Sequence, residues 1–381
     1  MANRKEMARR RVAEAATDLR RISHWMYENP ELAYQEYKSS ARLVEYLSSA
    51  GFDIEYPAYG LDTAFAARIG SSGPQVVVCA EYDALPSIGH ACGHNIIATA
   101  ALGAGFALAP MADDLGIRLT VLGTPAEENF GGKVELIEAG AFDDVQAAMM
   151  IHPSTADVVD PNVIAVAHLD VHYRGKAAHA SAYPQQGINA LDAAVQAYVN
   201  VSTLRQHIYS TDKVHGIIAQ GGDAPNVIPD YTRSSYYVRA QNRDRLDGLL
   251  PKVIACFEGA ATATGCRLEV ENVGHVYDEL VSNSTMVELF AANSAKLNRP
   301  LLRGDELPPS QTGSTDMGNV SKVTPTIHPM LSINSAPAVN HQKEFAAHTI
   351  TPDGDRAITD GALAMAWTVI DLAEQDHWDD L

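Results

Sequence analysis

The sequence has little cysteine, no long apolar run and no recognisable leader. Only four cysteines occur in 381 residues, and they are too scattered for the disulfide framework of a small secreted domain. No uninterrupted apolar stretch reaches the ~18 residues of a membrane span. The charged N-terminal segment lacks the apolar core of a secretory signal. We therefore expect a cytoplasmic protein that does not bind a membrane.

Cations are also scarce relative to carboxylates. Lys and Arg together number 28 against 47 Asp and Glu, which gives a formal net charge of −19. Because phosphate binding needs clustered cations, we expect no nucleic-acid partner. Hydrophobic residues make up 46% of the chain and charged residues 20%, as in an ordinary globular protein. The length predicts two domains, or one domain with an insertion.

Strands and helices alternate in the first part of the chain, which is typical of an α/β layer with a largely parallel sheet. Apolar periodicity predicts helices over residues 5–27, 37–47, 96–108 and 133–139, and strands over 63–69, 75–81, 117–122 and 147–151. A break at Asn29-Pro30-Glu31 separates the first two helices.

From about residue 165 the pattern changes to that of an inserted two-layer α+β unit. We expect strands over 165–173, 214–219, 231–239 and 267–272, with helices over 189–207 and 243–264. A helix over 284–297, a loop at 313–316, a strand over 329–333 and a final helix over 358–373 follow. The predicted fold is therefore α/β, with a mixed, largely parallel sheet between helices in a discontinuous domain (1–165 and 276–381) and an inserted α+β domain (166–275).

Several predicted strands are followed by side chains that suit a metal site. Loops that leave parallel strands meet at one edge of a sheet, where α/β proteins bind ligands. Cysteine and histidine at alternate positions suit a divalent transition metal. Adjacent glutamates suit a cation, with one carboxylate left as a general base. These candidates are Cys92, His94, Glu127, Glu128, His152 and His341.

Each of these groups has a structural interpretation when it is taken alone. Cys92 is then a buried thiol beside a capping histidine, and the glutamate pair is an exposed acidic turn. His152 and His341 are then hydrogen-bonding residues at strand ends. Taken together, the set is what two adjacent metal ions require.

The inserted domain contributes candidates of another kind. His179 and Asn226 could donate hydrogen bonds to a developing oxyanion, and Arg239 could pair with a substrate carboxylate. Roles in a helix cap, in a turn and on a solvated strand are the structural alternatives for these three residues.

The order of these motifs resembles the aminoacylase and carboxypeptidase type of co-catalytic metallopeptidases. The Cys-Gly-His form is similar to its amidohydrolase branch, and most similar to the dipeptidases that act on β-alanyl or γ-aminobutyryl dipeptides with basic residues. The stretches that carry the resemblance are Glu81 to Pro86, His90 to Asn95, Thr124 to Glu128, His152, Gly175 to Ser181, Val214 to Ile218, Asn226 to Pro229, Gly313 to Asp316 and His341.

The resemblance implies roles for particular residues and an inserted lid or dimerisation domain of ferredoxin-like α+β type. The implied metal ligands are Cys92, His94, Glu128, His152 and His341. Glu127 would be the general base, Asp83 would orient a ligand, and His179 would reach an active site, in family dimers that of the partner subunit. The implied substrate contacts are Asn226, Arg239, Gly313 and Ser314. Two positions depart from the family pattern. Glu81 stands where other branches have a ligand histidine, so we expect no ligand from it. Asn95 stands where many members have aspartate, which bears on the orientation of His94.

The implied activity is hydrolysis of an amide bond of a dipeptide or N-acyl amino acid by metal-activated water, in a homodimer. Two divalent ions are expected, zinc or manganese, with cobalt as a further candidate. Cleavage of another C–N bond, such as that of an aryl amine, and a catalytically silent homologue that binds a ligand or partner remain alternatives.

Overall fold

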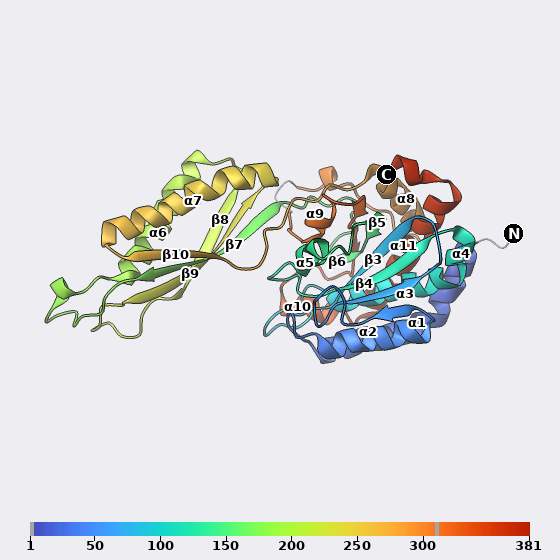
Figure 1. The fold of residues 1–381 in the computed structure, drawn as a ribbon, viewed down its shortest axis with the longest axis horizontal. Coiled ribbons are helices and arrows are strands. Elements are labelled where there is room, and N and C mark those ends of the chain that lie inside the picture. Colours follow the sequence, from blue (N-terminus) through green and yellow to red (C-terminus); the bar gives the residue numbers. More distant parts are fainter. Residues whose placement is uncertain (1–3, 309–311) are drawn as a thin grey trace. The chain divides into compact units, whose positions relative to one another are not determined.

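The computed structural model describes residues 4–308 and 312–381 and divides into two compact units. Unit 1 comprises residues 1–162 and 280–381, and unit 2 comprises residues 163–279. Unit 2 is thus inserted into the sequence of unit 1. Figure 1 shows the ribbon with its elements labelled.

The sheet of unit 1 is mixed, as the sequence predicts. Its strand order is β1-β2-β4-β3-β5-β11, and the pairs β3–β4, β3–β5 and β5–β11 are parallel while β1–β2 and β2–β4 are antiparallel. Strands β12 and β6 form a separate, parallel two-stranded sheet. The strands are β1 (Asp53–Glu55), β2 (Phe65–Ile69), β3 (Gln75–Glu81), β4 (Arg118–Thr124), β5 (Val145–Met149), β6 (His152–Ser154), β11 (Thr326–Ile327) and β12 (Met330–Ser332).

Helices surround this sheet. They are α1 (Arg4–Glu28), α2 (Tyr37–Ser49), α3 (His94–Leu108), α4 (Ala112–Leu115), α5 (Gly132–Glu138), α8 (Ser284–Ala295), α9 (Met317–Val320), α10 (Lys343–His348) and α11 (Pro352–Glu374). Helix α3 is apolar on all sides because it packs against α1, α11 and the strands β3 and β4. Its Gly103 lies so close to α11 that an added Cβ would be 2.8 Å from the Ala362 Cβ.

The stretch His94–Leu115 is apolar enough to cross a membrane by length and composition alone. However, 83% of its most apolar window is buried inside the protein. Its hydrophobicity is therefore explained by its place in the core of unit 1.

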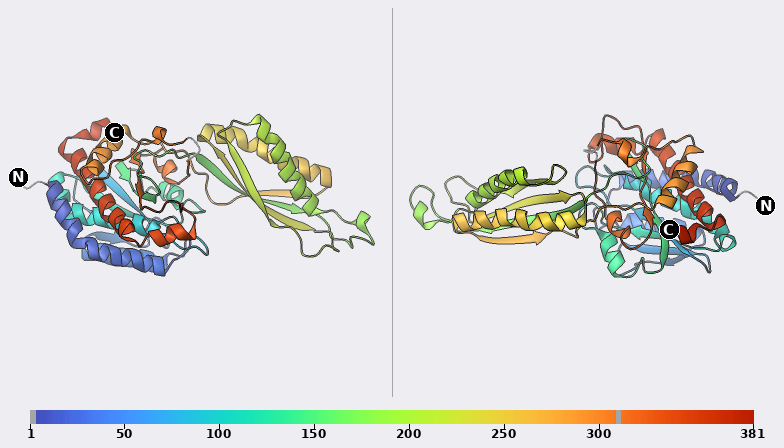
Figure 2. Two further views of the ribbon diagram at one scale, coloured as in Figure 1. Left: turned by 180° about the vertical axis from the view of Figure 1, so that it is seen from behind. Right: turned by 90° about the horizontal axis from the view of Figure 1, so that it is seen from above.

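Unit 2 has the β-α-β-β-α-β order of a ferredoxin-like fold. Its sheet has the order β10-β7-β9-β8, and all neighbours are antiparallel. Helices α6 and α7 pack side by side on one face of this sheet (Figure 2). The elements are β7 (Ala165–Arg174), α6 (Ala190–Leu204), β8 (Lys213–Gln220), β9 (Tyr231–Ala240), α7 (Arg243–Thr264) and β10 (Arg267–Asn272).

Candidate functional site

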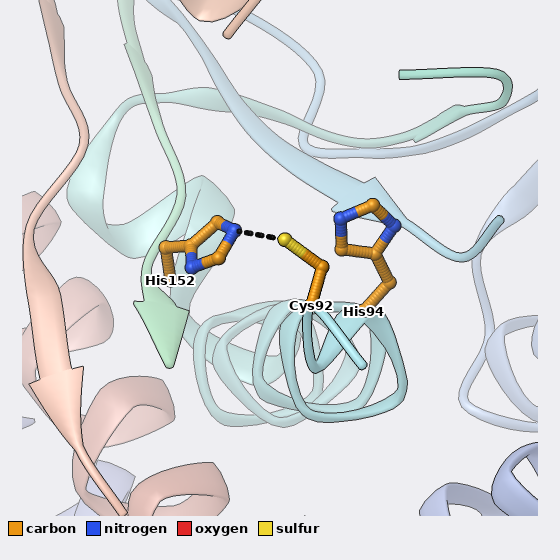
Figure 3. Close-up of side chains that lie close together, drawn as sticks. All are labelled: Cys92, His94 and His152. Carbon is orange, nitrogen blue, oxygen red and sulfur yellow. Dashed lines mark hydrogen bonds between the residues drawn. The ribbon is translucent and has the colours of Figure 1, made fainter. Parts of the chain in front are cut away.

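The Cys-Gly-His segment lies at the N-terminus of α3, beside strand β6. Gly93 is the N-cap and has a φ of +83°. A Cβ on Gly93 would be 2.3 Å from the Cγ of Pro153, so only glycine permits this approach. The close packing brings Cys92 and His94 next to His152, the first residue of β6 (Figure 3).

Asp83 fixes the ring of His94. The Nδ1 of His94 donates to the backbone oxygen of Asp83 at 2.8 Å and lies 3.0 Å from its carboxylate Oδ1. This contact leaves Nε2 as the atom able to bind a metal. Burial alone would lower the pKa of His94, but the carboxylates of Glu81 and Asp83 outweigh it and hold this pKa well above its usual range.

Asn95 takes no part in orienting His94. Its Nδ2 donates to the Ser23 Oγ at 2.9 Å and to the Thr349 Oγ1 at 3.2 Å, so it joins α3 to neighbouring segments of the core. The departure from aspartate at this position therefore leaves the His94 ring held by Asp83.

Cys92 contacts two histidines that come from distant parts of the chain. Its Sγ lies 3.5 Å from the Nε2 of His152 and 3.5 Å from the Nε2 of His341. His152 is held through its Nδ1, which donates to the Pro153 backbone oxygen at 2.7 Å. Burial and the Glu128 carboxylate raise the pKa of the Cys92 thiol well above its usual range. A bound cation would favour the thiolate instead.

Glu127 and Glu128 follow strand β4, and a residue with positive φ directly before them sets their position. Ala126 has a φ of +62°, and its N–H donates to the Glu36 Oε1 at 3.0 Å. The N–H of Glu128 donates to the Asp83 Oδ2 at 3.0 Å. Burial and neighbouring carboxylates raise the pKa of Glu128 to about 7 and that of Glu127 well above its usual range.

The two oxygens of Glu128 face different histidines. Its Oε1 lies 3.7 Å from the Nε2 of His94, and its Oε2 lies 3.5 Å from the Nε2 of His341. A carboxylate placed in this way can bridge two cations. The structure thus brings all five predicted ligands together with Glu127 and Asp83.

Buried polar atoms at this cluster fit a metal. Glu81 Oε1, His94 Nε2 and Glu128 Oε1 are buried and have no hydrogen-bond partner among the described residues. Such groups are costly unless a cation compensates them. Three overlapping sets of side chains each place their ligand atoms within 4.8 Å of one another: Cys92, His94 and His152; Cys92, Glu128 and His341; and Glu81, His94 and Glu127. Thiolate, imidazole and carboxylate together suit a transition metal such as zinc.

One part of this cluster is missing from the sequence-based prediction. The ammonium group of Lys133, on α5, is fully buried and forms ion pairs with Glu81 and with Asp316. A lysine at a helix start ordinarily lies on a solvated face, so the sequence pattern gives no sign of this pairing. Its position five residues after Glu128, the second of the predicted strand-end glutamates, is the one available signal.

The candidate substrate residues are divided between the units. In unit 2, His179 and Asn226 lie on adjacent loop segments, because the Ala180 N–H donates to the Asn226 backbone oxygen at 3.0 Å. The Nδ1 of His179 accepts from the backbone N–H of Ser181 and of Ala182, which leaves the proton of a neutral ring on Nε2.

Arg239 lies on β9, with its guanidinium over the Tyr237 ring and its Nε 3.4 Å from the His215 Nε2. Burial lowers the pKa of Arg239 from its usual value. Gly313 and Ser314 lie in unit 1, in the loop that leads to Asp316, and the Gly313 N–H donates to the Asn162 backbone oxygen at 3.4 Å.

Comparison with known proteins shows which family the chain belongs to. The Xaa-Arg dipeptidase of Mus musculus is 41% identical, with 97% of this chain and 88% of that protein covered. Residues 164–263 match the family model M20_dimer, described as a peptidase dimerisation domain. The chain belongs to the M20 peptidase family. The Xaa-Arg dipeptidase of Homo sapiens is 38% identical over 95% of this chain and 87% of that protein.

A solved structure supports the fold of this M20 peptidase. A dinuclear metal binding peptidase of the M20 family from Bacillus subtilis matches with a TM-score of 0.71 and 21% identity. The match covers 95% of this chain and 99% of that one. The predicted family and fold class are thereby confirmed.

Proposed function

We propose that this protein is a metal-dependent dipeptidase that hydrolyses the amide bond before a basic residue, with arginine or lysine on the carboxyl side. The observation that carries the proposal is the cluster of thiol, imidazole and carboxylate groups, in which Glu81 Oε1, His94 Nε2 and Glu128 Oε1 are buried without a hydrogen-bond partner among the described residues. The names of the two Xaa-Arg dipeptidase relatives supply the substrate class.

The residues that would hold the metal are the five predicted ligands. Cys92, His94, Glu128, His152 and His341 converge in unit 1, and Glu128 would serve both ions. When bound, two divalent ions supply Lewis acidity and make a water molecule acidic near neutral pH. The thiol of Cys92 favours zinc, while the imidazole and carboxylate groups also suit manganese or cobalt.

Glu127 would move the proton. Its carboxyl group is buried and lies beside Glu81, Glu128 and Asp316, which raise its affinity for a proton. Such a group takes a proton from the attacking water and delivers it to the amide nitrogen as the C–N bond breaks. Asp83 keeps the His94 ring in place meanwhile.

The residues of unit 2 would bind the substrate. The Nε2–H of His179, with Asn226 beside it, is a donor suited to an oxyanion. Arg239 would pair with the α-carboxylate, and Gly313 and Ser314 of unit 1 would contact the substrate backbone.

We further propose that the protein is a homodimer that works in the cytoplasm. The family model over residues 164–263 is that of a dimerisation domain. Strand β8 is an edge of its sheet, with Ile217 65% exposed, and an exposed apolar edge strand is a pairing surface. All four cysteines are free, which suits a reducing compartment.

The test is an assay of dipeptides with defined metal content. β-Alanyl, γ-aminobutyryl and α-aminoacyl dipeptides of arginine and lysine should be cleaved faster than N-acetyl amino acids and aryl amides. Chelation should abolish turnover, and Zn²⁺, Mn²⁺ or Co²⁺ should restore it. Cys92→Ala should lose metal more readily than Cys79→Ala, its buried matched control. Full activity without metal, or cleavage of aryl amides alone, would refute the proposal.

A further inference from the structure

Glu81 ends strand β3 with its two carboxylate oxygens in different surroundings. Its Oε2 pairs with the Lys133 ammonium group, and Lys133 also binds the Asp316 Oδ1 at 2.7 Å. Its Oε1 has no hydrogen-bond partner among the residues that the structure describes. One oxygen is therefore held firmly, and the other is presented to the metal cluster.

The free oxygen faces the metal-binding nitrogen of His94. Glu81 Oε1 lies 3.0 Å from His94 Nε2, yet within the described part of the chain neither atom has a partner with hydrogen-bond geometry. Two ligands at about 2.1 Å from a shared tetrahedral ion lie about 3.4 Å apart. The two atoms are thus close but are not aligned for a hydrogen bond, as expected when both face a common ion.

Two further carboxylates face the same nitrogen of His94. The Glu127 Oε2 lies 3.9 Å from His94 Nε2, and the Glu128 Oε1 lies 3.7 Å from it. Glu81, His94 and Glu127 are all buried. Lys133 brings one positive charge for the two carboxylates of Glu81 and Asp316, so a cation bound beside Oε1 would offset the remaining negative charge.

We propose that Glu81 is itself a metal ligand, binding through Oε1 the ion that His94 binds, while Lys133 and Asp316 hold its other oxygen. This inference rests on the proposed function and extends its ligand set. It differs from the expectation, based on the family resemblance, that position 81 supplies no ligand.

Two matched double variants test this ligand. Glu81→Gln/Lys133→Met and Asp316→Asn/Lys133→Met each remove the lysine and one carboxylate, so both change the charge of the cluster equally. Only the first removes the proposed ligand. The metal-free proteins are titrated with Co²⁺, and stoichiometry, affinity against a competing chelator and the visible absorption of the bound ions are measured.

We expect the variant that lacks Glu81 to bind one ion at least tenfold more weakly than the wild type, with an altered Co²⁺ spectrum. The variant that keeps Glu81 should bind both ions and lose less affinity than the first, because it removes only groups that hold the ligand in place and not the ligand itself. If the Glu81 variant binds both ions as the wild type does, or if the Asp316 variant is the weaker binder, the inference is wrong.

A structure of the metal-loaded wild type gives a second test that needs no variant. We expect the Glu81 Oε1 at about 2.0–2.2 Å from an ion, and a separation above about 3 Å from both ions would overturn the inference. Wild-type protein that binds two ions but cleaves no dipeptide would refute the proposed function alone, because these metal measurements do not depend on turnover.

Discussion

Glu127 is the carboxyl group whose chemistry can be separated from metal binding. Glu127→Gln keeps the shape of the side chain and removes its proton affinity. We expect turnover to fall by about 10²- to 10⁴-fold while two ions per chain are retained, as measured by steady-state kinetics and metal analysis on the same sample. Glu128→Gln is the contrasting variant and should lose metal. Normal turnover in Glu127→Gln with its metal intact would exclude the general-base role.

Glu36 is a buried carboxyl group that acts on the backbone turn. It accepts hydrogen bonds from the Ala126 N–H at 3.0 Å and from the Thr63 Oγ1 at 2.9 Å. Burial and the nearby Asp83 carboxylate raise the pKa of Glu36 from 4.5 to about 7. The folded protein therefore holds this proton through a pH range in which the unfolded chain has lost it.

This raised pKa predicts a pH-dependent stability. Because the folded state binds more protons between pH 4.5 and about 7, the contribution of Glu36 is full below 4.5 and is lost as the pH rises through 7. The loss in the free energy of unfolding is about 3 kcal/mol, because a pKa difference of one unit corresponds to about 1.4 kcal/mol.

Glu36→Gln cannot ionise and should lack this decline. Urea unfolding of the variant and the wild type at pH 5 and pH 7.5, with equal metal content, should show a difference in unfolding free energy that shifts in favour of the variant at the higher pH. Parallel pH profiles would show that Glu36 keeps an ordinary pKa.

For single residues, the sequence predicted which side chains converge, but it did not predict the buried ion pairs beside them. Cysteine, histidine and glutamate at strand ends are visible in a sequence because the chemistry is carried by residue type. The pairing of Lys133 with Glu81 and Asp316 joins α5, β3 and the segment before α9. Such a contact depends on tertiary packing, and a lysine alone gives no indication of it.

Among the elements, the helices and strands with strong apolar patterns were predictable. The predicted ranges 75–81, 243–264 and 267–272 agree with β3, α7 and β10. The final helix begins at Pro352, not at residue 358, because its first turn is polar and lacks apolar periodicity. Thr351 accepts from the Gly354 N–H as N-cap, so Thr-Pro was the missed signal. Strand β6 was missed because three residues are too short for alternation to be seen.

Strand β8 carries the prediction about assembly. Its Ile217 is 65% exposed at the edge of the unit 2 sheet. If this edge pairs with a second copy, Ile217→Asp should bury charge at the contact and raise the dimer dissociation constant at least tenfold. Sedimentation velocity over a concentration series measures it. Val323→Asp, at a 51% exposed apolar position of unit 1, should leave the dimer intact; equal effects of both changes would count against β8.

For the whole molecule, the decisive property is that the proposed chemistry is divided between two units. Glu127 and all five candidate ligands belong to unit 1, whereas His179 lies exposed in unit 2. The family resemblance predicts that His179 serves the site of the partner subunit. Single variants of either residue lose activity whichever chain His179 serves, so they cannot test this prediction.

Mixing two inactive variants does test it. If His179 acts on the partner, a heterodimer of His179→Ala and Glu127→Gln chains has one site with both defects and one site with neither. Each heterodimer should then regain about half of the wild-type activity. With random exchange of equal amounts, about half of the dimers are mixed, and the sample should reach about a quarter of wild-type turnover. Exchange is followed independently with differently tagged chains. Activity no greater than the sum of the two variants, once exchange is complete, would mean that each site is completed within one chain, because every heterodimer site would then carry one defect.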